Sequence, residues 1–200
     1  MKRAWWILMM VLALGVALYA VTLFISPAAR PDFLATSPVP FALLAHFSGS
    51  AVAMAVGPFQ FLVSWRARRP TLHRWMGRAY AGGILVGGLA GLRMSFFSQG
   101  GVVAHVGFGL LAILWLATTT TAVVSILNGD IRTHQRWMTR SFALTLAAVT
   151  LRIYLPAALV SGIAFDAAYP VIAWACWVPN LIAAEWFLGA RRAPRALSAV

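Results

Sequence analysis

The sequence predicts an all-α integral membrane protein with six transmembrane helices. Hydrophobic residues make up 62% of the 200 residues and charged residues only 10%, whereas soluble domains carry about 25% charged residues. Six apolar runs reach the length of about 18 residues at which a run reads as a membrane-spanning helix. Because they use most of the chain, we expect a single membrane domain over residues 1–200. The predicted spans are residues 4–26, 39–65, 75–97, 101–127, 137–163 and 167–190.

The first run follows Lys2 and Arg3, as the core of a signal peptide would. It is longer than such a core, which has about 7–15 residues. It also has no clear small-residue cleavage site, so we predict a retained helix.

The net charge of +12 is distributed along the chain in a pattern typical of membrane topology. Basic residues gather at alternate helix ends, which the positive-inside rule assigns to the cytoplasm. We therefore predict a bacterial inner-membrane protein with both termini cytoplasmic, with lipid headgroups rather than nucleic acid as partners. The single cysteine, Cys176, excludes an intrachain disulfide and a multi-cysteine metal site. The basic clusters are Lys2 and Arg3; Arg66, Arg68, Arg69, Arg74 and Arg78; Arg132, Arg136 and Arg140; and Arg191, Arg192 and Arg195, while the other ends carry only Arg30, Asp32 and Asp166.

An internal repeat divides the chain. Residues 74–81 read RWMGRAYA and residues 136–143 read RWMTRSFA. The interval from His46 to Arg93 and that from His105 to Arg152 are both 47 positions. We infer a four-helix core made of a duplicated two-helix unit, with parallel copies. Arginine and tryptophan also mark the inner interface of unrelated helices, which is the alternative explanation of the motif. The units are about 39–97 and 101–163, flanked by helices 4–26 and 167–190.

The four histidines are distributed one to each of the four core helices. His46 and His105 lie some turns inside their spans, at depths that differ by about 5 Å if the helix entries are level. Two neutral imidazoles at one level are typical of a b-type haem site, so we expect this pair to bind haem iron. His73 and His134, at the inner boundary, are candidates for a second haem. The alternative for both pairs is hydrogen bonding to neighbouring groups.

Four arginines are candidates for contacts with an anion. Arg93 and Arg152 are predicted near the level of the first histidine pair, where haem propionates or a substrate carboxylate would neutralise them. Arg78 and Arg140 are predicted near the inner pair of histidines, where a second porphyrin or a lipid headgroup would supply the anion. For the deeper pair, the alternative is snorkelling of the side chains toward the outer surface.

Simpler roles are predicted for the other polar residues inside the spans. Glu185 is predicted to pair with Arg78 or Arg140. Gln60 follows a predicted break at Gly57 and Pro58, where it could bind a quinone head or, more simply, a neighbouring helix. The threonines near 117–123 and the glycines at 82, 83, 87, 88 and 91 are predicted packing surfaces.

Two resemblances add to this interpretation. The motifs GPFQF, HRWMGRAY and RWMTRSFAL resemble a bacterial family of predicted membrane proteins known only as a domain of unknown function, over about residues 40–190. The pattern of helices and histidines resembles the cytochrome b561 family. That second resemblance implies two haems, one held by His46 and His105 and the other by His73 and His134. It also implies electron transfer from ascorbate or a quinol.

The leading hypothesis is therefore a b-type haem electron carrier, a possible membrane oxidoreductase that takes electrons from a quinone-type or small anionic donor. One alternative is a transporter or channel in which the buried histidines and arginines line an anion or proton path. The other is a scaffold or sensor subunit whose polar residues only pack.

Overall fold

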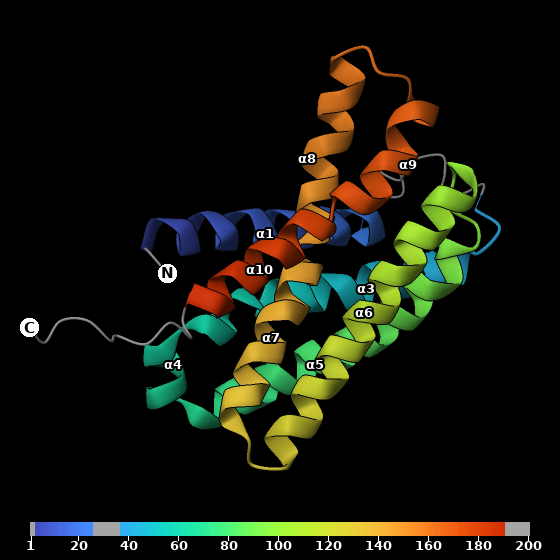
Figure 1. Cartoon of the computed structure of the whole chain (residues 1–200). Coiled ribbons are helices and arrows are strands. Elements are labelled where there is room, and N and C mark those ends of the chain that lie inside the picture. Colours follow the sequence, from blue (N-terminus) through green and yellow to red (C-terminus); the bar gives the residue numbers. More distant parts are fainter. Residues whose placement is uncertain (1–2, 26–36, 191–200) are drawn as a thin grey trace, which may run out of the picture.

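The computed structural model describes residues 3–25 and 37–190, in which every regular element is helical (Figure 1). Lys2, Arg30, Asp32, Arg191, Arg192 and Arg195 lie outside the described residues, so the structure does not test their predicted places at helix ends. The elements are α1 (Arg3–Ile25), α3 (Pro40–Val56), η2 (Pro58–Phe61), α4 (Val63–Arg68), α5 (Pro70–Ser95), α6 (Gly101–Leu127), α7 (Ile131–Thr145), α8 (Ala147–Val160), α9 (Phe165–Ala175) and α10 (Val178–Ala190).

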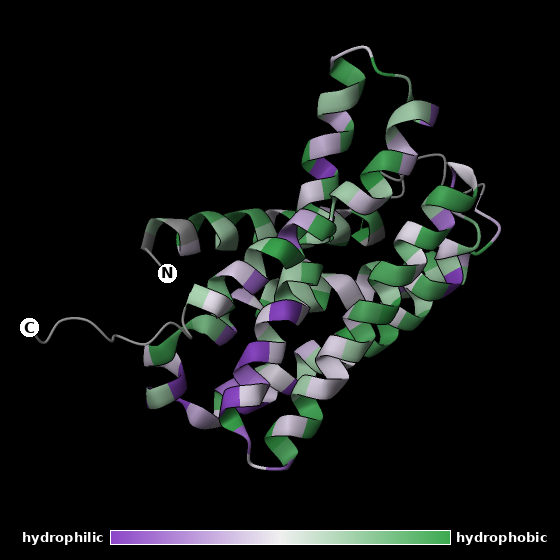
Figure 2. Ribbon diagram, in the orientation of Figure 1, coloured by the Kyte–Doolittle hydropathy of each residue, from purple (hydrophilic) through white to green (hydrophobic). Residues whose placement is uncertain are grey.

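Five stretches of the described chain are long and apolar enough to cross a membrane. The all-α membrane class is thus confirmed, whereas the count of six spans is not. The remaining predicted span, 75–97, falls in α5, which is helical but carries Arg74, Arg78 and many glycines, and these lower its hydropathy. Figure 2 shows hydrophilic residues gathered around α4 and the starts of α5 and α7, here named the basic end. The five stretches are Trp6–Leu23, Pro40–Phe61, Gly101–Leu127, Ile131–Val160 and Phe165–Ala190.

The closest helix contact in the structure joins the backbones of α3 and α5. Gly83 and Gly87 are one turn apart on α5 and face Gly49 of α3. A methyl group added to Gly83 would lie 2.7 Å from the carbonyl oxygen of Gly49, so glycine is required at this contact. Small residues that let backbones approach are the usual means by which helices associate in lipid. The prediction that the α5 glycines form a packing surface is confirmed for Gly83, Gly87, Gly88 and Gly91, whereas it is wrong for Gly82, which is exposed.

Three of the apolar stretches are broken, the first near its end and the other two near their middle. Gly57 and Pro58 end α3 and start the short η2. Leu146 separates α7 from α8, and Cys176 and Trp177 separate α9 from α10. Pro179 has no N–H to donate to the carbonyl four residues before it, and the side chain of Asn180 donates to the neighbouring carbonyl of Cys176 at 3.0 Å. Such breaks bring backbone polar groups and side chains to the interior of a bundle.

The two copies of the Arg-Trp-Met motif share a local geometry. In α5 the guanidinium of Arg78 lies 4.8 Å from the ring centre of Trp75, and in α7 that of Arg140 lies 4.5 Å from the ring centre of Trp137. The two pairs of helices with the most extensive packing are α3 with α5 and α6 with α7. Both observations are compatible with a duplicated two-helix unit, which stays a prediction.

The α3–α5 contact gives a matched test of helix packing. Gly83→Ala should lower the free energy of unfolding by about 1–3 kcal/mol, because the added methyl group overpacks the contact with Gly49. Gly82→Ala is the control, because a methyl group there meets no atom within 4 Å and alanine favours the helix. Thermal unfolding of the purified protein in detergent compares the two. Equal stability of the variants would show that the backbone contact does not hold these helices together.

Candidate functional site

His46 occupies the glycine-lined face between α3 and α5. Its Nδ1 atom lies 2.8 Å from the carbonyl oxygen of Gly87, and a methyl group on Gly91 would come within 2.9 Å of the same nitrogen. Because a carbonyl only accepts, Nδ1 carries the proton and Nε2 is left free. The ring of Trp115 on α6 meets the imidazole edge-on, with the ring centres 6.5 Å apart. Glycine on α5 is therefore what makes room for an imidazole at this helix contact.

His105 lies at a different level of the bundle. Its Nε2 atom is 2.8 Å from the carbonyl oxygen of Ser98, in the segment that joins α5 to α6. Ser98 is eleven residues beyond Gly87, and His105 is ten residues before Trp115. The interval within α6 corresponds to about 15 Å along the helix axis, and Ser98 lies beyond the end of α5. The depth argument from sequence assumed level helix entries, and the structure instead separates the two histidines along the bundle axis.

A haem between His46 and His105 does not fit this arrangement. Two imidazoles on one metal must bring their nitrogens to within about 4 Å of each other. Ten residues of α6, about 15 Å along its axis, separate His105 from the tryptophan that the His46 ring contacts. Each of the two rings also has its own backbone carbonyl partner. No chemical step through haem is derived from this pair.

The inner histidines, His73 and His134, lie within electrostatic range of each other. His134 of α7 has its Nδ1 atom 2.9 Å from the carbonyl oxygen of Ala122. The pKa of His73, at the start of α5, is lowered below its usual 6.5 by partial burial, and further by the charges of Arg66, His134 and Arg74. The pair is therefore within electrostatic range, and a second haem held by His73 and His134 stays a prediction.

A buried network of hydroxyl groups lies beside Trp115, at the centre of α5, α6 and α7. The hydroxyl of Tyr80 is 2.9 Å from both Ser141 Oγ and Thr145 Oγ1. Trp115 Nε1 donates to Thr145 Oγ1 at 2.9 Å, and Thr119 Oγ1 is 2.7 Å from Ser141 Oγ. None of these five side chains is more than 6% exposed. The sequence analysis singled out only the threonines, and as a packing surface, because a hydroxyl in a span gives no sign of its partners.

The network has more contacts than hydrogens to fill them. Thr145 also approaches the Ser141 carbonyl, and Thr119 the Trp115 carbonyl, at 2.9 and 2.8 Å. Four hydroxyl hydrogens and one indole hydrogen thus serve six close contacts. One contact is always without a hydrogen, and which one depends on how the hydroxyls are turned. Hydrogens can therefore rearrange here while every buried group keeps a partner.

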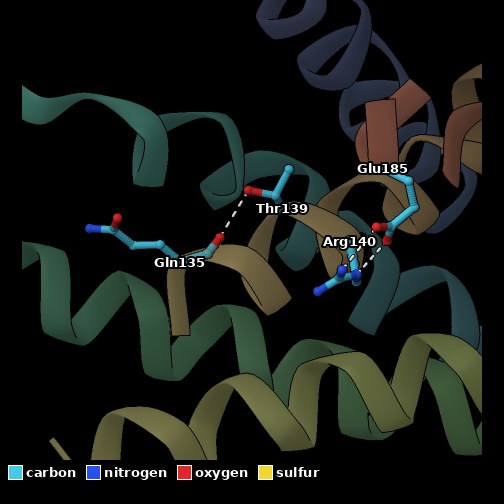
Figure 3. Close-up of polar contacts among 4 residues, drawn as sticks. All are labelled: Gln135, Thr139, Arg140 and Glu185. Carbon is cyan, nitrogen blue, oxygen red and sulfur yellow. Dashed lines mark hydrogen bonds and ion pairs between the residues drawn. The ribbon is translucent and has the colours of Figure 1, made fainter. Parts of the chain in front are cut away.

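Arg140 on α7 forms an ion pair with α10 at the surface of the bundle, where the Glu185 side chain is 49% exposed. Its Nε atom is 2.5 Å from Glu185 Oε1 of α10, and its Nη2 atom is 2.9 Å from Oε2 (Figure 3). The bidentate geometry satisfies both charges at once. The expectation that Glu185 pairs with Arg78 or Arg140 is therefore confirmed for Arg140, whereas Arg78 is exposed over Trp75.

Arg152 on α8 has a different environment. Its Nη1 atom donates to the carbonyl of Ala148, and its guanidinium lies 5.4 Å from the ring centre of Tyr19 on α1. It is half-buried and lies within electrostatic range of His46. Arg140–Glu185 is the only ion pair among residues 3–25 and 37–190. Arg152 is thus a cation in an apolar stretch with no carboxylate partner there.

Arg93 does not join this group. Its side chain is exposed, and its guanidinium lies 4.5 Å from the ring centre of Phe97, beyond the end of α5. This is the snorkelling alternative given in the sequence analysis. Of the two deep arginines predicted, the structure brings only Arg152 close to a histidine.

Comparison with known proteins identifies the family of this chain. Residues 43–188 match the sequence pattern of a family described as "Predicted membrane protein (DUF2306)". The chain belongs to this family. His46, Arg152 and the hydroxyl network all lie within the DUF2306 region, whereas Tyr19 precedes it. No curated protein and no solved structure matches the chain. The first resemblance is therefore confirmed, and the resemblance to cytochrome b561 stays a prediction.

Two threonines of α7 allow a matched test of the hydroxyl network. Thr145→Val leaves the buried N–H of Trp115 without its acceptor, which should lower the free energy of unfolding by about 1–3 kcal/mol. In Thr139→Val, the lost hydroxyl bonded only to the Gln135 carbonyl one turn away (Figure 3), so a change within about 0.5 kcal/mol is expected. Chemical denaturation in detergent measures both. If the two variants lose the same stability, the network is not a structural centre.

Proposed function

We propose that this DUF2306 protein binds a small anion between α1, α3 and α8 and moves it across the membrane. The observation that carries the proposal is Arg152, a cation in an apolar stretch, within electrostatic range of His46 and with no carboxylate partner among the described residues. Charged side chains inside a membrane are costly and usually mark a ligand or ion pathway. A bound anion would supply the missing negative charge.

The comparison with Arg140 strengthens this proposal. Both arginines belong to the broken stretch Ile131–Val160. Arg140 is neutralised by Glu185, so it needs nothing further. Arg152 has only a backbone carbonyl and the face of Tyr19, which stabilise a guanidinium without cancelling its charge. The chain thus contains one compensated and one uncompensated cation in the same stretch.

His46 adds a second polar group to the proposed site. Because its Nδ1–H is held by Gly87, the orientation of the ring is fixed and Nε2 is free. A free imidazole nitrogen accepts a hydrogen bond, or donates one after protonation. A pair of Arg152 and His46 therefore suits a small oxyanion or carboxylate better than a metal ion.

The haem electron carrier is the second candidate, and the inner histidines favour it. His134 donates Nδ1–H to a carbonyl, which leaves Nε2 free, and the ordinary metal-binding histidine has this arrangement. His73 is within electrostatic range of it. This candidate places a haem at the basic end, and a quinol or a small anion would be the electron donor. The scaffold alternative requires neither a ligand nor a cofactor.

We also propose that the basic end faces the cytoplasm, with both termini on that side of a bacterial inner membrane. Arg66, Arg68, Arg69 and Arg74 gather there around α4 and the start of α5. An excess of such residues close to helix ends is what sets orientation.

Anion flux tests the first proposal directly. Liposomes containing the full chain, loaded with potassium acetate or potassium chloride, should release potassium in the presence of valinomycin faster than liposomes without protein. Arg152→Gln should slow this release about tenfold or more, the effect of losing one charge-assisted hydrogen bond. The double variant Arg140→Gln, Glu185→Gln is the control, because it removes a pair that is already neutral.

Three outcomes would contradict anion transport. They are no release above protein-free liposomes, a wild-type rate in Arg152→Gln, and an equal loss in the double variant. A visible spectrum of the same purified protein decides the second candidate. A reduced-minus-oxidised band of low-spin haem that disappears in His134→Ala would establish the electron carrier.

Orientation is measured by reporter fusions. A reporter active only in the periplasm should work when fused at Ser98, in the segment between α5 and α6, and fail at Asn128, between α6 and α7. The reverse pattern would place the basic end outside and overturn the proposed topology.

A further inference from the structure

A small recess lies at the basic end, where the chain passes from η2 through α4 into α5. Its polar lining consists of Gln60, Arg66, Arg69 and His73, and Phe59 and Trp65 form part of its apolar wall. Its volume is about 10 Å³, roughly the space for one water-sized group. The two aromatic rings stack with their centres 5.4 Å apart, which fixes α4 against η2.

The local sequence explains why these side chains converge. Pro58 starts η2, and Leu62 then adopts an extended conformation that turns the chain into α4. Arg69 is again non-helical, and Pro70 starts α5. These two breaks bring residues of η2, α4 and the start of α5 around one point.

Gln60 provides the most specific sign of a ligand. Its Nε2 atom is buried and has no hydrogen-bond partner among the described residues. A methyl group on Gly77 of α5 would lie 3.7 Å from its Oε1, so the amide faces α5 rather than lipid. A buried donor left unpaired costs about 1–3 kcal/mol. An acceptor atom entering the recess would remove this cost.

The charges around the recess identify the kind of acceptor. Arg66, Arg69 and His73 contribute cationic or protonatable groups, and no carboxylate is among the residues that line it. The pKa of His73 is lowered by partial burial and by neighbouring cations, so an anion here would reverse part of that effect. The recess is too small for a whole molecule, but it suits one oxygen of a larger anion that remains outside.

A phosphate group matches these features. One of its oxygens would accept from Gln60 Nε2, and the other oxygens would stay at the rim within reach of two guanidinium groups. We propose that this recess binds a phosphate group, supplied by an anionic lipid headgroup or by inorganic phosphate. The site is separate from Arg152 and does not depend on anion transport.

The test compares arginines in α4 and immediately after it. Purified full-length protein in a zwitterionic detergent is titrated with short-chain phosphatidylglycerol, and separately with sodium phosphate against sodium chloride at equal ionic strength. The shift in unfolding temperature gives the half-saturating concentration, because a ligand bound only by the folded state stabilises it. Each variant is measured relative to its own temperature without ligand.

Arg66→Gln and Arg69→Gln should each raise the half-saturating concentration about tenfold, as the loss of one charge-assisted hydrogen bond predicts. Arg68→Gln is the matched control, because Arg68 is exposed on the same helix and does not line the recess. Gln60→Leu should weaken binding and keep the side chain's size. A lower half-saturating concentration for phosphatidylglycerol than for phosphate identifies the headgroup, and the opposite order identifies free phosphate.

Other outcomes would overturn the phosphate site. One is the absence of stabilisation by either ligand. Another is an equal effect of Arg66→Gln and Arg68→Gln, which would indicate only diffuse surface charge. Unchanged binding in Gln60→Leu would show that the buried amide is not part of the site. Arg152→Gln should leave phosphate binding unchanged. A failure of the phosphate-site proposal can therefore be distinguished from a failure of the anion-transport proposal.

Discussion

The contact between the backbones of α3 and α5 determines much of the remaining structure. Gly49 meets Gly83 and Gly87 at a separation that allows no side chain between them. In a lipid environment, such close approach replaces the hydrophobic effect as the source of helix association. The same face of α5 continues to Gly91, where the absence of a side chain admits the ring of His46. The position of the candidate histidine is thus a consequence of helix packing.

From His46 the interior continues through Trp115 into the hydroxyl network. Trp115 touches the imidazole with its ring and donates its N–H to Thr145. The network is fully buried, and each hydroxyl has more than one partner. Buried polar groups are stable only when they are satisfied in this way. Against this background, the uncompensated charge of Arg152 is the exception, and for that reason it carries the functional proposal.

The two halves of the molecule differ in their polar chemistry. Near His46 a single cation is half-buried among apolar helices, whereas the basic end has several arginines around the short helix α4. The break at Gly57 and Pro58 connects the two regions, because it ends α3 and directs the chain into η2. Gln60 lies two residues after that break, in η2. Its buried Nε2 donor has no hydrogen-bond partner among the described residues. Helix breaks therefore place both candidate binding regions of this chain.

The sequence by itself determined the class of protein, the helices and most of their positions, because apolar length and charge distribution are local properties. It also determined that Glu185 needs a basic partner and that the α5 glycines pack closely. Only the tertiary structure decided which arginine pairs with Glu185, and that His46 and His105 lie at different levels. Sequence spacing measures distance along one helix, but the relative height of two helices depends on where each enters the bundle. The hydroxyl network was hidden for the same reason, since Tyr80, Thr119 and Ser141 come from three helices and acquire their partners only when those helices pack.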